Sequence, residues 1–325
     1  WLSGSESVYV SGKYAYVANE NGDGIGIIDL GGIDAPSANI GALQVNTLNA
    51  TENLTVANNA YISNGLNVGA GGIATDGLLA GGALDISAKI EPKIVGGVVS
   101  STALNGATSV YVSGNYAYVA ADTDDSLRII DISNPTSPSI VGGVSSTALD
   151  GAASVYVSGK YAYVANSNND SLRIIDISNP TSPSIVGGVA SSTALTGTNS
   201  VYVSGKYAYV GRYAGSTLAI VDISNPIGTS TIVGQSAALL GPVRDVQVVG
   251  KYAYVGTDYG ISVVDISNPY TPLTVGNTIS NDFGAYAINV VGKYAYAVDS
   301  SQTFSIVNIT SSTAPVILPS ITDAT

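Results

Sequence analysis

The chain has 325 residues, of which 38 are Gly and only 10% are charged, and its formal net charge is −12. The absence of Cys excludes disulfides and thiolate chemistry, and the absence of His excludes Ser-His-Asp triads and histidine-ligated metals. The acidic balance argues against nucleic acid as a partner, and no apolar run has the roughly 18 residues that a transmembrane helix needs.

The tripeptide Tyr-Ala-Tyr marks a repeat that runs through the whole chain. Its copies lie about 45 residues apart, except that the first two are separated by a longer stretch. They begin at Tyr14, Tyr116, Tyr161, Tyr207, Tyr252 and Tyr294. The sequence therefore predicts six copies of one structural unit, with an insertion in the first copy.

Each unit is predicted to contain four short β-strands and essentially no helix. In the second copy, runs of β-forming residues at 110–112 and 116–120 flank a small polar turn, which is typical of a β-hairpin. A third run covers 127–132, and a fourth begins at 138 after an Asn-Pro pair, because proline cannot donate to a strand ladder. Four strands recurring with this period predict an all-β fold, a six-bladed β-propeller. The numerous Tyr side chains are interpreted as packing between blades rather than as a ligand-stacking track.

The repeat also carries recognisable motifs. Most copies contain a pentapeptide such as Leu218-Ala-Ile-Val-Asp222 followed by Ile-Ser-Asn-Pro, and a hairpin such as that at 248–255. With these motifs the chain resembles the LVIVD-repeat proteins over everything except roughly residues 31–88. The resemblance implies a β-propeller found in bacterial and archaeal surface or secreted proteins, a family whose biochemical role is mostly unassigned. The last copy departs from the pattern, since Asn308 replaces the Asp and Ser311-Ser312 replaces Asn-Pro.

We expect two parts in the chain, a propeller formed by residues 1–30 and 89–325, and an inserted β-rich extension at 31–88. The chain begins and ends at the same point of the repeat, which gives six whole units without strand exchange across the termini. The blades would then close by face packing alone, unless upstream sequence supplies more.

The first unit contains a turn that resembles the first half of a calcium-binding loop. Asn19, Asn21 and Asp23 alternate before a Gly, but Leu30 stands where such a loop has its Glu. Asn, Asp and Gly are also the residues that tight turns require, and turn chemistry is the preferred interpretation. Calcium is the alternative, and no other cofactor is expected.

A recurring Asp near the end of the third strand is interpreted as structural. It lies at the same point of five units, before a turn, where a carboxylate can accept hydrogen bonds from backbone N–H groups. The members of this set are Asp29, Asp131, Asp176, Asp222 and Asp265.

The insertion differs from the repeats in its composition and residue pattern. Pairs of apolar residues alternate with Gly and Asn, a pattern that resembles short β-solenoid or phage-fibre repeats. Because the insertion contains only a few such short strands, they need other strands to pair with, either in their own propeller or in another chain. The predicted assembly residues are Leu54, Val56, Tyr61, Ile62, Leu66, Val68, Ile73 and Leu78.

The loops that precede the first strands of the units are the predicted binding surface, because propellers carry function where their copies differ. Most of these loops are small and neutral, but the last two contain a charge pair and aromatic residues. Arg244, Asp245, Phe283 and Tyr286 are therefore the candidate residues for binding a carbohydrate or peptide. Sequons at Asn49, Asn53, Asn169 and Asn308 would permit glycosylation.

These features predict a non-enzymatic extracellular protein. An enzyme without His or Cys would need carboxylate pairs or Lys and Tyr bases, and the acidic positions are explained by turns. The absence of Cys and Met and the scarcity of Lys and Arg favour a cell-surface or secreted location. The preferred hypothesis is a structural protein that assembles with copies of itself into a filament or sheath through the insertion. The alternative is a surface adhesin that binds glycans or proteins.

Overall fold

The computed structural model describes residues 5–11, 14–19, 24–29, 93–278, 284–299 and 304–318. Contacts divide the chain into two units, Trp1–Leu30 with Ile94–Thr325, and Gly31–Lys93. The described strands belong to six antiparallel sheets, each of four consecutive strands, apart from one additional short strand. These sheets are the blades of a six-bladed β-propeller, as the repeat predicts.

Each of the first three blades is a meander of neighbouring strands. Blade 1 contains β1 (Ser5–Ser11), β2 (Tyr14–Asn19), β3 (Gly24–Asp29) and β4 (Lys93–Val99). Blade 2 contains β5 (Ala107–Ser113), β6 (Tyr116–Ala121), β7 (Ser126–Asp131) and β8 (Ser139–Ser145). Blade 3 contains β9 (Ala152–Ser158), β10 (Tyr161–Asn166), β11 (Ser171–Asp176) and β12 (Ser184–Ala190). A short 3₁₀ helix, η1 (Thr147–Leu149), joins blades 2 and 3.

The last three blades follow the same order. Blade 4 contains β13 (Thr198–Ser204), β14 (Tyr207–Arg212), β15 (Thr217–Asp222) and β17 (Thr231–Gln235). Blade 5 contains β18 (Val243–Val249), β19 (Tyr252–Thr257), β20 (Gly260–Asp265) and β21 (Leu273–Asn277). Blade 6 contains β22 (Ala287–Val291), β23 (Tyr294–Val298), β24 (Phe304–Asn308) and β25 (Val316–Ile317). The extra strand β16 (Gly228–Thr229) pairs in parallel with β12 and links blade 4 to blade 3.

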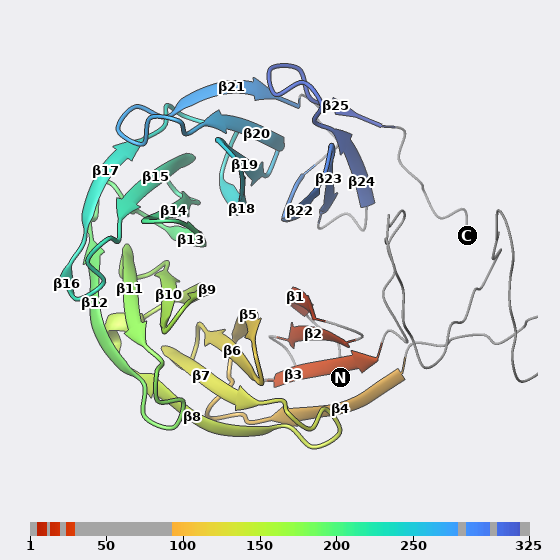
Figure 1. Ribbon diagram of the computed structural model, residues 1–325, viewed down its shortest axis with the longest axis vertical. Coiled ribbons are helices and arrows are strands. Elements are labelled where there is room, and N and C mark those ends of the chain that lie inside the picture. Colours follow the sequence, from red (N-terminus) through yellow and green to blue (C-terminus); the bar gives the residue numbers. More distant parts are fainter. Residues whose placement is uncertain are drawn as a thin grey trace, which may run out of the picture. The chain divides into compact units, whose positions relative to one another are not determined.

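The core lies between the blades. In Figure 1 the first strands β1, β5, β9, β13, β18 and β22 lie innermost, and the fourth strands form the outer rim. Five apolar clusters each join one blade to the next in chain order. We call the face of a blade that packs on the following blade its trailing face, and the opposite one its leading face.

The Tyr-Ala-Tyr motif supplies both faces. At the junction of blades 2 and 3, Tyr118 and Ile129 of the trailing face pack on Val155, Val157 and other residues of the next leading face. The Ala between the two Tyr belongs to the leading face, because successive strand residues point to opposite sides.

First strands are joined by a repeated hydrogen bond. The Ser109 hydroxyl accepts a hydrogen bond from the Val155 amide of the next blade at 3.2 Å, and the Ser154 hydroxyl accepts one from the Val201 amide at 3.2 Å. Ser200 does the same for Val246 at 3.1 Å. Each bond satisfies a backbone donor at the inner edge of a sheet.

Tyrosine rings form a second inner contact. Tyr9, Tyr111, Tyr156 and Tyr202 follow one another from blade to blade, with ring centroids 4.7 to 5.0 Å apart. Burial, above all, raises the pKa of the Tyr111 and Tyr156 hydroxyls. These rings pack between blades, as the sequence predicts for the abundant Tyr.

Glycine in the fourth strand permits a third contact, at the outer rim. A Cβ on Gly142 would lie 2.0 Å from the Pro180 carbonyl oxygen, in the Asn-Pro turn of the following blade. The same approach to an Asn-Pro turn occurs at Gly96, Gly187 and Gly234, and at Gly276 the partner is the carbonyl oxygen of Ser312, because Ser311-Ser312 replaces Asn-Pro in blade 6. The Asn-Pro turn and the glycine are therefore two halves of one interblade contact.

Candidate functional site

The strongest departure from the repeat is a cluster shared by blades 4, 5 and 6. Tyr213 lies in the turn from β14 to β15, Arg244 near the start of β18, Asp258 in the turn from β19 to β20, and Tyr286 just before β22. In an antiparallel blade, the start of the first strand and the turn between the second and third strands lie at the same end. The topology therefore brings these residues to one end of the propeller.

Arg244 is the centre of this aromatic cluster. Its guanidinium carbon lies 4.5 Å from the centroid of the Tyr213 ring and 4.2 Å from that of Tyr286. Its Nε donates to Asp258 Oδ1 at 2.6 Å, and a terminal nitrogen donates to the Tyr286 hydroxyl at 3.3 Å. A guanidinium paired with a carboxylate and placed over two aromatic rings is well suited to hold loops of different blades together.

The charge of Arg244 is balanced within the cluster. Partial burial disfavours its charged form, but the hydrogen bond and the charge of Asp258 outweigh this effect and raise the pKa of Arg244. The guanidinium stays protonated, and the carboxylate beside it cancels the charge. A ligand at this cluster therefore meets polar groups and aromatic rings, with little net charge.

Three tyrosines of this end are open to solvent. Tyr213 is 39% exposed, Tyr286 is 36% exposed, and Tyr259, directly after Asp258, is 56% exposed. The Tyr259 ring lies over Gly241, where an added Cβ would be 2.5 Å from ring atom Cδ2. The cluster thus presents aromatic rings held at defined positions, which is the usual composition of a recognition surface.

Asp245, which follows Arg244 and is partly buried, has a carboxylate that already bonds to protein groups, and its predicted binding role stays a prediction. Its carboxylate accepts the amides of Ile288 at 2.9 Å and Val246 at 2.8 Å, and the Ser200 hydroxyl at 3.2 Å. It takes the place of the serine in the inner interblade hydrogen bond. Burial is the largest influence and raises the pKa of Asp245 to about 6.

The sequence prediction and the cluster overlap in part. Arg244 and Tyr286 come together as expected, whereas Phe283 lies outside the described residues. Sequence reasoning missed Tyr213, Asp258 and Tyr259. All three lie in turns between second and third strands, and comparing those turns for aromatic residues could have found them, since the turns of blades 2 and 3 have none.

Four of the five recurring Asp residues cap turns, as predicted, and the side chain of Asp29 lies outside what the structure describes. Asp131 Oδ1 accepts the Ser133 amide at 2.8 Å, and Asp176, Asp222 and Asp265 make the same bond two residues ahead. These bonds to the charged form, from the serine hydroxyl first and then the amide, lower the pKa of the four carboxyls. In blade 6, Asn308 makes the equivalent bond to the Thr310 amide at 3.0 Å.

The other predicted sites lie mostly outside the described residues. This holds for Asn21 and Asp23 of the calcium alternative, for Asn49 and Asn53, and for all the predicted assembly residues of the insertion. In the described turns equivalent to the calcium loop, Asp125 and Asp170 have φ of 48° and 46°, the left-handed conformation that Asp tolerates in turns. The side-chain amide of Asn169 donates to the Thr147 carbonyl, so the atom that would carry a glycan is engaged.

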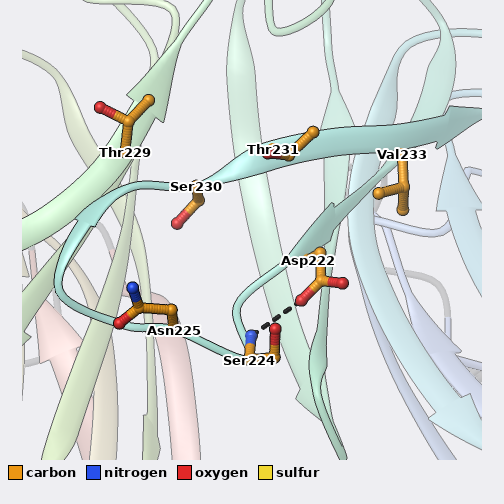
Figure 2. Close-up of a pocket in the computed structure, with 7 residues that line it drawn as sticks. All are labelled: Asp222, Ser224, Asn225, Thr229, Ser230, Thr231 and Val233. Carbon is orange, nitrogen blue, oxygen red and sulfur yellow. Dashed lines mark hydrogen bonds between the residues drawn. The ribbon is translucent and has the colours of Figure 1, made fainter.

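A polar hollow of about 300 Å³ lies at the other end of blade 4 (Figure 2). Its lining residues are Asp222, Ser224, Asn225, Thr229, Ser230, Thr231 and Val233. Asp222 accepts the Ser224 amide, so the charged group of this hollow already has a partner. The lining contains no aromatic residue, which distinguishes this hollow from the aromatic cluster.

Several solved structures share the fold. A functionally unknown protein from Desulfotomaculum acetoxidans matches with a TM-score of 0.66 at 11% identity, over 99% of this chain and 86% of that one. A putative 6-phosphogluconolactonase from Bacteroides uniformis matches with a TM-score of 0.64 at 13% identity, over 94% and 81%. Hydrazine synthase of Kuenenia stuttgartiensis matches with a TM-score of 0.60 at 15% identity, over 94% of this chain and 77% of that one. Likeness at such identities shows a common fold alone.

The comparison with curated proteins found no match. Within the described residues, no helix has the length and apolar character to cross a membrane. The model of the LVIVD repeat matches six segments, residues 4–47, 106–146, 151–191, 197–230, 240–279 and 284–323. Because these segments cover most of the sequence and coincide with the six blades, the chain belongs to the LVIVD-repeat family.

Proposed function

We propose that this protein is a non-enzymatic, extracellular recognition module that binds neutral saccharides of a surface through the aromatic cluster. The observation that carries the proposal is a group of exposed tyrosines at one end of three blades: Tyr213 and Tyr286 lie against Arg244, and Tyr259 directly follows its partner Asp258. Tyrosine and arginine are the residues that most often dominate the energy of a binding surface.

The chemistry of the cluster favours a neutral sugar over a charged ligand. Sugar rings have apolar faces that can lie on exposed aromatic rings, and hydroxyls that can bond to Arg244, Asp258 and the Tyr hydroxyls. Because Asp258 already balances Arg244, an anionic ligand would find no free charge to bind. The net charge of −12 would also repel it.

Two observations support a non-enzymatic role. The sequence lacks His and Cys, the commonest base and the strongest nucleophile. Asp245, the described carboxyl whose pKa is raised to about 6, already accepts hydrogen bonds from protein donors of blades 4, 5 and 6. The extracellular location is proposed from composition and from the family, and cell fractionation tests it.

Screening the intact protein on a glycan array and then titrating the best ligand by calorimetry tests the binding proposal. Tyr259→Ala should weaken binding at least about tenfold, because a stacking ring of about 1.4 kcal/mol is lost while the Arg244 contacts remain. Tyr270→Ala is the matched control, since Tyr270 is 62% exposed in the turn between β20 and β21, at the other end of blade 5.

Binding that survives Tyr259→Ala and Tyr286→Ala would refute the proposal, as would an array with no neutral glycan bound. Binding of peptides alone would show a different ligand class. The sequence hypothesis of a filament formed through the insertion stays a prediction, because its residues lie outside those described.

A further inference from the structure

The polar hollow of blade 4 lies where this blade departs from the repeat. Ser230 of blade 4 corresponds to Pro183 of blade 3, since each comes just before the residue that pairs with the turn-capping Asp. A buried proline occupies this position in blades 2, 5 and 6 as well, namely Pro138, Pro272 and Pro315. In blade 4 a serine hydroxyl therefore stands where blades 2, 3, 5 and 6 have a proline ring.

The turn that leads to Ser230 is also longer by one residue. Ser230 lies five positions after Asn225, whereas Pro183 lies four positions after Asn179. The longer turn contains β16, which pairs with β12 of blade 3. The Ser230 amide continues this contact and donates to the Gly188 carbonyl at 3.0 Å. This segment is therefore held against blade 3, and the hollow of about 300 Å³ lies beside it (Figure 2).

The Ser230 side chain is the first sign that the hollow takes a ligand. Ser230 is only 5% exposed, and its Oγ has no hydrogen-bond partner among the described residues. Buried hydroxyls almost always have a partner, so an occupant of the hollow is needed to supply one. Figure 2 shows this hydroxyl pointing from its own segment toward the turn that contains Ser224 and Asn225. Ser230 thus offers both a donor and an acceptor to a molecule in the hollow.

Asp222 adds a negative charge to the lining. Hydrogen bonds from the Ser224 hydroxyl and then from the Ser224 amide lower the pKa of Asp222, and the charge of Lys206 lowers it further, so the carboxyl is ionised at neutral pH. Among the described residues no Lys or Arg forms an ion pair with Asp222, whereas Lys251 Nζ lies 3.4 Å from the equivalent Asp265 in blade 5. The carboxylate can therefore accept a cationic partner.

The rest of the lining is polar except for Val233. Ser224, Thr229 and Thr231 contribute hydroxyls, and Asn225 contributes an amide. A volume of about 300 Å³ is at the lower end for small-molecule sites and is much larger than one water molecule or metal ion needs. Such a lining suits a ligand rich in hydroxyls rather than an apolar one.

We propose that the hollow of blade 4 binds a small polyol that carries a primary amine, such as an amino sugar. The ammonium group bonds to the Asp222 carboxylate, and a ligand hydroxyl bonds to Ser230. The net charge of −12 also favours a cationic ligand. This site is independent of the proposed saccharide binding by the aromatic cluster, which lies at the other end of blade 4 and favours neutral ligands.

An NMR titration of the intact protein, followed at the backbone amides of Ser224 and Ser230, tests the proposal at the site itself. Glucosamine should shift these amides in a saturable way. Glucose and N-acetylglucosamine have similar rings but no ammonium group, and they should bind there at least about tenfold more weakly, because a charge-assisted hydrogen bond is lost. Ethylamine, which has no hydroxyl, should also bind more weakly. No saturable shift with glucosamine, or equal affinity for glucose or ethylamine, would overturn the inference.

Asp222→Asn tests the role of the charge. The turn should survive, because Asn308 caps the equivalent turn of blade 6 by accepting the Thr310 amide at 3.0 Å. Glucosamine binding should weaken at least about tenfold. Asp265→Asn is the matched control, since it makes the same change in blade 5, where a proline occupies the position of Ser230, and binding should be unchanged. Equal affinity of Asp222→Asn and the wild type would contradict the proposal.

Ser230→Ala tests the role of the hydroxyl and keeps the amide that donates to Gly188. Loss of one neutral hydrogen bond should weaken glucosamine binding about threefold or more, and unchanged affinity would contradict the assignment of Ser230. Tyr259→Ala should leave glucosamine binding in the hollow unchanged. The proposals for the hollow and for the aromatic cluster therefore fail or stand separately.

Discussion

Blades 3 and 6 are built on the same four-stranded pattern, yet they treat their trailing faces differently. Blade 3 buries Leu172 and Ile174 completely against blade 4, whereas blade 6 leaves Phe304 substantially exposed. The difference coincides with changes in sequence at the hydrogen-bonding serine and the rim glycine. The comparison teaches that the repeat encodes the contacts between blades, residue by residue.

Shortening the equivalent isoleucine of each blade should show the difference between the two faces most strongly. Ile174→Ala in blade 3 should lower the free energy of unfolding by about 2–5 kcal/mol, because it leaves a cavity in a closed interface. Ile306→Ala at the equivalent position in blade 6 should cost about 1 kcal/mol or less, because that position is only half-buried. Chemical denaturation of both variants measures this, and equal losses would contradict the difference in burial.

Asp245 gives a pH dependence that the serines at its place in other blades cannot give. Burial raises its pKa to about 6 from an ordinary value of 3.8, so the folded state binds its proton more tightly than the unfolded state. The stability contributed by this group is present below about pH 4 and is lost as pH rises to about 6, by up to about 3 kcal/mol.

Urea denaturation of wild type and Asp245→Asn across this range isolates the effect. The wild type should lose stability relative to the variant as pH rises through the window. Asp176 and the other turn carboxyls have lowered pKa values and act in the opposite direction, but they are common to both proteins and cancel in the difference. A constant difference between the two proteins would show that Asp245 titrates at its ordinary pKa.

The outer-rim contact predicts a smaller effect. Gly142→Ala would place a Cβ 2.0 Å from the Pro180 carbonyl oxygen, and the required shift should cost about 1–3 kcal/mol. Gly159→Ala is the comparison, since Gly159 has φ of 58° and no atom within 4 Å of the added Cβ. It should cost about 1 kcal/mol from backbone conformation alone. Thermal unfolding ranks the two, and a reversed order would be inconsistent with the rim contact.

The inner hydrogen bond is expected to have the smallest effect. Ser154→Ala removes the acceptor of the Val201 amide and should cost about 1 kcal/mol. Faster hydrogen exchange at the Val201 amide would locate the change. Ala287→Ser, at the same position in blade 6, should leave the stability of the monomer unchanged, and a stabilised monomer would mean that blade 6 already packs on a neighbour.

The sequence predicts much of this fold because each blade repeats the same local pattern. Tyr-Ala-Tyr and its neighbouring turns specify strands, hairpins and the Asp caps through interactions within a few residues. The contact of Arg244 with Tyr213 and Asp258 could not be predicted in this way. Those residues come from different turns, and only the placement of blades 4 and 5 brings them together. The partners of Asp245 could not be predicted for the same reason, since Ser200 and Ile288 lie in the two adjacent blades.

The most direct test of the central claim compares the reactivity of single cysteines placed on the two faces. At low protein concentration, Val298→Cys in blade 6 should react rapidly with a thiol reagent, Ala165→Cys in blade 3 should be protected, and Leu273→Cys on the outer rim should react freely. Equal protection of Val298→Cys and Ala165→Cys would contradict the difference in burial between the two blades.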